Sequence, residues 1–135
     1  PLPTIARVFC VNVTKANLRV GPGADYEIGW QVNKYMPFVQ VAISLSGDWY
    51  GVEDVDKTVL WIKKDLVTDK YRCTVVTTPD VNIRTGPGAH HPMSALGVAD
   101  QYDSFKVEKS QRDWIKVRAE DNRSGWIRGD FLWTP

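Results

Sequence analysis

The stretch that decides the fold is Asn82-Ile83-Arg84-Thr85-Gly86-Pro87-Gly88-Ala89, because it occurs twice in the chain. The earlier copy, Asn17-Leu18-Arg19-Val20-Gly21-Pro22-Gly23-Ala24, begins 65 residues upstream and is identical at six of the eight positions. In both copies an extended Asn-apolar-Arg segment leads into Gly-Pro-Gly. Proline fixes φ near about −65° and glycine can adopt φ > 0 at no steric cost, so the triplet turns the chain sharply. A strand and turn that recur at a fixed period indicate a duplication.

Two further motifs, Asp-Trp-x-x-Val and Trp-Ile-x-x-Asp, recur at the same spacing of 65 residues. The intervening segments 29–47 and 94–112 match poorly. This mismatch is compatible with duplication, because insertions in surface loops cost little free energy. The matched pairs are Asp48-Trp49 with Asp113-Trp114, and Trp61-Ile62 with Trp126-Ile127.

The pattern of apolar residues predicts an all-β protein of short strands. Residues 38–43 alternate apolar and polar side chains, and residues 5–13 are rich in β-branched and aromatic types. No capped stretch of about 11 residues has a helical period. Residues 64–67 are expected to close the first unit as a helical turn and a last strand, and residues 131–133 the second. The other predicted strands are 17–20, 28–32, 48–52 and 58–63, then 74–78, 80–85, 95–98, 104–108, 113–118 and 125–128.

Length and composition limit the classes of function. At 135 residues, with 43% hydrophobic and 24% charged residues, the chain is one globular domain or two small ones. The formal net charge of +1 lacks the basic excess that nucleic-acid binding requires. No apolar run approaches the ~18 residues of a membrane span. We therefore expect no nucleic-acid partner and no membrane span, and we interpret the Met-less start at Pro1 as a trimmed or processed secreted precursor.

The spaced motifs resemble bacterial SH3-like (SH3b) domains, whose pattern is Asn-apolar-Arg-x-Gly-Pro, Trp-x-x-Val and Gly-Trp-apolar. The second repeat carries all three, the last as Gly125-Trp126-Ile127. The first repeat has Leu60 where the glycine is expected, so its closing turn and groove are predicted to differ. The resemblance covers nearly the whole chain. It implies two small SH3-like barrels in tandem, at residues 1–67 and 72–135, with a linker at residues 68–71.

The short linker predicts that the two barrels pack on each other, since each is near the smallest size that one core can support. Trp61 and Trp126 are expected in the barrel cores. The residues expected at the interface or in satellite cores are Trp30, Tyr35, Tyr50 and Trp133.

The two cysteines leave two alternatives open. Cys10 and Cys73 are too few and too far apart for a zinc site of the paired CxxC kind. They are either two buried free thiols or one disulfide that joins the first strands of the two repeats. A disulfide would suit an oxidising compartment and would help small domains to be stable.

We predict no catalytic residues, no metal and no cofactor. The two histidines, His90 and His91, are adjacent in one loop, and Asp25 and Tyr26 replace them in the first repeat, so no histidine site is duplicated. The acidic residues, Asp54 among them, are interpreted as solvated turn formers. Arg19 and Arg84 are interpreted as structural, bonded to turn carbonyls or to Asp65 and Asp130.

Aromatic residues near the turns are the best candidates for ligand contact, because flat side chains stack on sugar rings and cover extended peptides at low entropic cost. One set follows the Gly-Pro-Gly turn and the other lies at the start of the Trp-x-x-Val strand, beside aspartates that could orient a ligand. The candidate ligand-binding residues are Tyr26, Asp48, Trp49, His90, His91, Asp113 and Trp114.

The resemblance implies a non-catalytic, extracytoplasmic module that binds cell-wall peptidoglycan, either its peptide or its glycan. Such modules act beside a catalytic domain in cis or in trans, and two linked weak sites raise the effective affinity. One alternative is a protein-interaction module that binds an extended segment of a partner protein. A second alternative is the non-catalytic part of a cell-wall hydrolase.

Overall fold

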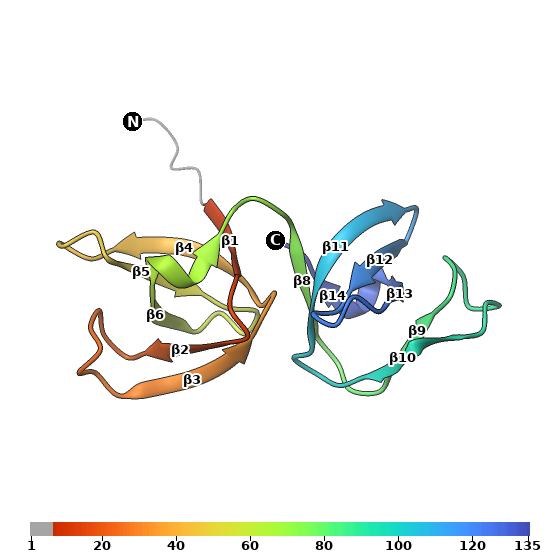
Figure 1. The fold of residues 1–135 in the computed structure, drawn as a ribbon, viewed down its shortest axis with the longest axis horizontal. Helices are drawn as coiled ribbons and strands as arrows, with labels where there is room; N and C mark the ends of the chain where they lie inside the picture. The colour runs from red at the N-terminus through yellow and green to blue at the C-terminus, as the bar shows by residue number, and fades with distance from the viewer. Residues whose placement is uncertain (1–6) are drawn as a thin grey trace.

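The structure of the protein, a computed structural model, describes residues 7–135. Within these residues it contains two antiparallel sheets of seven strands each and no α-helix (Figure 1). The prediction of an all-β fold is confirmed. The first two residues of the strand predicted at 5–13 lie outside the described residues.

The two sheets have the same strand order. The first runs β3 (Ile28–Asn33), β2 (Lys15–Arg19), β6 (Val59–Lys63), β5 (Trp49–Glu53), β4 (Pro37–Ile43), β1 (Arg7–Val11) and β7 (Val67–Thr68). The second runs β10 (Met93–Ala99), β9 (Val81–Arg84), β13 (Ser124–Arg128), β12 (Trp114–Arg118), β11 (Ser104–Gln111), β8 (Cys73–Val76) and β14 (Leu132–Trp133). One-turn 3₁₀ helices, η1 (Lys64–Leu66) and η2 (Gly129–Phe131), precede the last strands.

The register of the last strands shows that the duplication extends to individual pairings. Cys10 lies opposite Thr68, and Val75 lies opposite Trp133. Both members of the second pair are 65 residues beyond their counterparts, so Val75 takes the place of Cys10. The first sheet thus ends at Thr68, one residue into the predicted linker, and the two cysteines are not equivalent positions. The domain boundaries themselves stay a prediction.

Alternation along the strands separates core from surface, as period-two patterns require. In β9, Val81 and Ile83 are buried while Asn82 is exposed. Trp126 is buried as expected, but Trp61 is only half-buried. The ring of Trp61 packs beside Gly51 on the neighbouring strand, where a Cβ would lie 3.4 Å from it.

The departure of the first repeat from the family pattern is compensated by an exchange of side-chain size. In the second barrel, a Cβ on Gly125 would lie 2.5 Å from Ile83 Cγ2 and 2.7 Å from Ser94 Oγ. In the first barrel the larger residue, Leu60, stands at this place, and Gly29 occupies the position that matches Ser94. A Cβ on Gly29 would lie 2.9 Å from Leu60 Cδ2. Large and small residues have therefore changed places across the barrel.

The barrels share their hydrophobic interior at the junction. The core cluster of the first barrel includes Val75 of β8, which is fully buried, and packs against Trp133 of β14. Trp30 of the first barrel makes an edge contact with Tyr102 of the second, with ring centroids 5.6 Å apart. Tyr50 packs instead on Phe9 within its own barrel, with ring centroids 5.0 Å apart. The prediction that the barrels pack on each other is confirmed.

A disulfide at the centre of the junction joins Cys10 of β1 to Cys73 of β8, with the two Cα atoms 6.0 Å apart. Both cysteines are buried in a cluster with Tyr35, and the cluster packs against Tyr71. The Tyr71 hydroxyl donates a 2.7 Å hydrogen bond to Asn12 Oδ1 of the first barrel. Burial, and secondly the neighbouring Tyr35, raises the pKa of Tyr71 to about 12. Of the two alternatives for the cysteines, the disulfide is the one observed.

Polar contacts complete the junction. Ser104 Oγ donates to the Lys34 carbonyl at 2.7 Å, and the Tyr102 hydroxyl donates to Asp56 Oδ2 at 2.7 Å. Thr14 Oγ1 donates to Glu120 Oε1 at 2.6 Å. This last contact places the turn between β12 and β13 against the loop between β1 and β2.

We predict that the disulfide contributes strongly to stability, because it closes a loop across a sequence separation of 63 residues. Replacing both cysteines with alanine is expected to lower the free energy of unfolding by about 2–4 kcal/mol. Urea unfolding measures this loss, and reduced wild-type protein should lose a comparable amount. Wild-type protein whose urea midpoint does not move on complete reduction would contradict the prediction.

Candidate functional site

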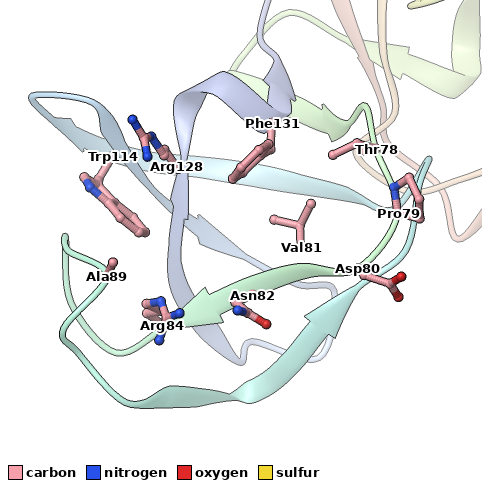
Figure 2. Close-up of a pocket in the computed structure, with 10 residues that line it drawn as sticks. All are labelled: Thr78, Pro79, Asp80, Val81, Asn82, Arg84, Ala89, Trp114, Arg128 and Phe131. Carbon is pink, nitrogen blue, oxygen red and sulfur yellow. The ribbon is translucent and has the colours of Figure 1, made fainter.

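A pocket of about 320 Å³ opens on the second barrel (Figure 2). Its walls come from the loop after β8, from β9, from the loop after Gly-Pro-Gly, and from the ends of β12, β13 and η2. The lining residues are Thr78, Pro79, Asp80, Val81, Asn82, Arg84, Ala89, Trp114, Arg128 and Phe131.

One long side of the pocket is β9, the strand that begins the repeated octet. Asn82 and Arg84 of β9 are spaced by two residues, so strand geometry sends their side chains to the same face, and Asp80 stands immediately before the strand. Asp80 has a φ of 59°, a left-handed conformation that aspartate tolerates better than most residues. An acid, an amide and a guanidinium therefore all line the pocket.

The two ends of the pocket carry opposite charge. Figure 2 shows Asp80 beside Pro79 and Thr78 at one end, with Arg84, Arg128 and Trp114 toward the other. Arg128 Nε lies 3.2 Å from Asp130 Oδ2 in an exposed ion pair, which is weak in solvent. Asp80 has no ion-pair partner among the described residues.

Two aromatic side chains also line the pocket. Phe131 is 39% exposed, although it is a large apolar residue, and Trp114 is half-buried at the start of β12. Exposed aromatic faces above a polar floor suit a flat sugar ring or an extended peptide backbone. The pocket therefore has the shape and chemistry of an open groove for an elongated polar ligand.

A second hollow, also of about 320 Å³, lies at the junction and is lined by both barrels. Its walls include Asn33 and Lys34 of the first barrel, and Asp103, Glu120 and Arg123 of the second. Burial raises the pKa of the Asp103 carboxyl, against the lowering effect of a backbone hydrogen bond from Asp100. The aromatic residue of this second hollow is the buried Phe105, so its lining offers no exposed ring like that of Phe131.

Of the seven residues predicted to contact ligand, only Trp114 lines the first pocket. The rings of Tyr26 and His91 lie on the Gly-Pro-Gly turns instead. A Cβ on Gly21 would come within 2.4 Å of the Tyr26 ring, and a Cβ on Gly86 within 2.6 Å of the His91 ring. These rings therefore brace the turns, although Tyr26 remains 46% exposed.

This packing corrects the reason given for the glycines. Positive φ occurs among glycines of the described residues only at Gly47 and Gly97, not in either Gly-Pro-Gly triplet. The triplets need glycine because an aromatic or imidazole ring occupies the space that a Cβ would fill. His90 packs in the same way over Gly88, and its ring centroid lies 4.2 Å from that of His91.

The predicted aspartates take part in turn geometry. The Asp113 carbonyl accepts a 2.7 Å hydrogen bond from Gly129 N, and the Asp48 carbonyl accepts one of 3.0 Å from Lys64 N. The Asp48 carboxylate also lies 3.8 Å from Lys64 Nζ. Trp49, the counterpart of Trp114, is half-buried.

The structural interpretation of the repeated arginines is confirmed. Arg19 NH1 donates to the Tyr26 carbonyl at 2.8 Å, and Arg84 NH1 donates to the His91 carbonyl at 3.0 Å. The interpretation of Asp54 as solvated was wrong. Asp54 is only 4% exposed, and its Oδ1 accepts 2.9 Å hydrogen bonds from the backbone N–H groups of Asp56 and Thr58.

Several pocket residues were not predicted from the sequence. Asp80, Asn82 and Arg128 line the pocket although they are distant in the sequence from Trp114, and Phe131 was assigned to the closing segment alone. The alternation along β9 was the one available signal, since it places Asn82 and Arg84 on one face.

Between residues 7 and 135 there is no group of three or more His, Cys, Asp or Glu side chains that could hold a metal ion. Within the same range, the structure has no helix with the length and apolar character of a membrane span.

Two family models, both described as Bacterial SH3 domain, match the chain, one over residues 12–69 and the other over residues 79–132. The chain is a tandem pair of bacterial SH3 domains. The predicted family and the predicted architecture of two SH3-like barrels are confirmed.

A curated relative of these bacterial SH3 domains is the Bacillus subtilis (strain 168) protein named "Putative N-acetylmuramoyl-L-alanine amidase YrvJ". It is 25% identical over 126 residues, which cover 86% of this chain but 23% of the relative. The chain therefore spans about a quarter of that protein's length.

The comparison with solved structures gives matches that cover nearly the whole chain but have low TM-scores. An NlpC/P60 family protein from Bacillus cereus ATCC 10987 has a TM-score of 0.43 at 11% identity, covering 95% of this chain and 56% of its own. NlpC2 from Trichomonas vaginalis has a TM-score of 0.41 at 11% identity, covering 98% and 49%. The structure named Endolysin LysPBC5 CBD has a TM-score of 0.38 at 16% identity, covering 98% and 96%.

We predict that Gly86 is required because of the His91 ring. Gly86→Ala is expected to lower the free energy of unfolding by about 1–3 kcal/mol, since a methyl group would be forced against the imidazole. In a His91→Ala background the same substitution should cost much less. Urea unfolding of the four proteins in this cycle measures the difference, and equal costs in the two backgrounds would contradict the prediction.

Proposed function

We propose that this pair of bacterial SH3 domains is a non-catalytic, extracytoplasmic module that binds peptidoglycan through the groove of the second domain. The observation that carries the proposal is the open groove itself, which combines an exposed Phe131 and a half-buried Trp114 with oppositely charged ends. Large exposed aromatic residues in a concave surface with few polar anchors are typical of ligand sites.

The chemistry of peptidoglycan fits this groove. Its sugars offer flat faces for Trp114 and Phe131, and its peptides offer carboxylates, amides and ammonium groups for the polar floor and ends. The name of the Bacillus subtilis relative describes an N-acetylmuramoyl-L-alanine amidase, and that relative contains a region similar to this chain. This similarity supports the wall as the ligand source.

The proposed module has no catalytic part of its own. Both cysteines are bonded to each other, so neither provides a thiolate nucleophile. His90 and His91 pack on the turn glycines and on each other. Cleavage of the wall would then belong to a hydrolase domain in cis or in trans, which this module would hold on its substrate.

We predict that Trp114→Ala reduces binding to purified peptidoglycan by about tenfold or more, because a central aromatic side chain commonly carries a large share of the binding free energy. Co-sedimentation with purified sacculi measures the bound fraction over a range of protein concentrations.

Leu45→Ser is the matched control, since Leu45 is fully exposed on the first domain and far from the groove residues in the sequence. It should sediment like wild type. Wild-type protein that stays in solution with every sacculus preparation would refute wall binding. Capture of an extended protein segment by the groove in that case would favour the alternative of a protein-interaction module.

A further inference from the structure

The charges around the groove restrict the class of possible ligands more than the shape of the groove does. Resting on the wall-binding function proposed above, we infer that the ligand site is confined to the second domain and takes a short extended peptide with an ammonium group at Asp80 and a carboxylate at Arg128 and Arg84. The first domain, by this inference, supports the site and does not duplicate it.

The spacing of the charges sets the length of the peptide. Arg84 ends β9 and Asp80 stands one residue before the strand begins, four residues away. A fully extended chain rises about 3.3 Å per residue, so their Cα atoms are at most roughly 13 Å apart. An extended peptide of about four residues spans the same distance. A tetrapeptide laid along β9 therefore brings one terminus to each charged end.

The floor of the groove is free to bond the peptide backbone only in the second domain. In the first domain, Asn17 Oδ1 accepts a 3.0 Å hydrogen bond from Gln31 Nε2 on the neighbouring strand. In the second domain, the partner of Asn82 across the strands is Val98, which offers no polar side-chain atom. The exposed Asn82 amide therefore keeps both its donor and its acceptor for a ligand.

The charge pattern also differs between the copies. Lys15 stands where the second domain has Asp80, and Lys63 stands where it has Arg128. The first domain therefore has basic residues at both ends of the corresponding strip. A peptide with an ammonium terminus would meet a like charge there, which is unfavourable.

The junction closes one end of the strip in the first domain. Thr14, which matches Pro79 of the groove, donates its hydroxyl to Glu120 of the second domain. Its backbone carbonyl accepts a hydrogen bond from Lys34 N at 3.2 Å. The end of the first strip is therefore a contact between domains, while Pro79 and Asp80 are exposed.

The test uses tetra-alanine with free termini as the probe, together with its N-acetylated and its C-amidated forms. Isotope-labelled wild-type protein is titrated with each peptide and the affinity is read from NMR shifts. The indole N–H groups of Trp114 and Trp49 report on the second and first domains separately. We expect Trp114 to shift with the free peptide and Trp49 to stay unchanged.

Blocking either terminus should weaken binding by about twofold to fivefold, the range measured for single exposed charge pairs. Asp80→Asn should abolish the effect of N-acetylation and keep the effect of C-amidation. Arg128→Gln should do the reverse. The matched controls Lys15→Gln and Lys63→Gln, at the same places in the first domain, should leave all three affinities unchanged.

The inference is overturned if the blocked and free peptides bind with equal affinity, if no peptide shifts Trp114, or if Trp49 shifts as much as Trp114. Sedimentation with sacculi separates this failure from failure of the proposed function. If wild-type protein sediments with sacculi but binds free and blocked peptides equally, wall binding is supported and recognition of the peptide termini by the groove is refuted. Charge-dependent peptide binding without sedimentation would support the groove and refute the wall as its ligand source.

Discussion

The rest of the structure depends on how the two barrels bury surface against each other, because domains of this size have little core of their own. Val75 of the second barrel completes the core of the first, and the Cys10–Cys73 disulfide fixes the strands on either side. This arrangement also makes the surfaces of the two barrels different. The contact between Thr14 and Glu120 covers a part of the first barrel whose counterpart in the second barrel is open. Two copies that share a fold therefore do not share a surface.

The sequence predicted the fold well because the fold depends mainly on patterns that are local in the sequence. Strands follow from alternation, the duplication from three motifs at one spacing, and η1 from the closing segment of each repeat. The glycines of Gly-Pro-Gly were recognised as necessary, but for the wrong reason. None of these glycines has a positive φ. The constraint comes instead from the ring of Tyr26 or His91, which occupies the space that a Cβ would fill. The local sequence indicates that these positions require glycine, and only the packing shows which neighbouring group excludes a larger side chain.

The site was harder to predict than the fold, since its walls come from segments distant in the chain. Trp114 was found because it follows a turn, whereas Phe131 and Arg128 reach the groove through the closing strands. The comparison between repeats pointed to the unrepeated loop after Gly-Pro-Gly, where the side chains turned out to brace the turn. The informative differences were a substitution in a repeated segment, Asp80 for Lys15, and a register shift in β10 that places Val98 opposite Asn82 where the first repeat has Gln31 opposite Asn17.

The size exchange between Leu60 with Gly29 and Gly125 with Ser94 bears on how a duplicated chain avoids folding into the wrong pairs. Tandem copies with similar strands are prone to misassembly, in which a strand of one copy enters the sheet of the other. Here β6 placed in the second barrel would drive Leu60 into Ser94 and Ile83. In the reverse exchange, β13 in the first barrel would leave a void beside Gly29. Steric mismatch thus marks each strand as belonging to its own copy, and divergence at two positions protects the fidelity of folding.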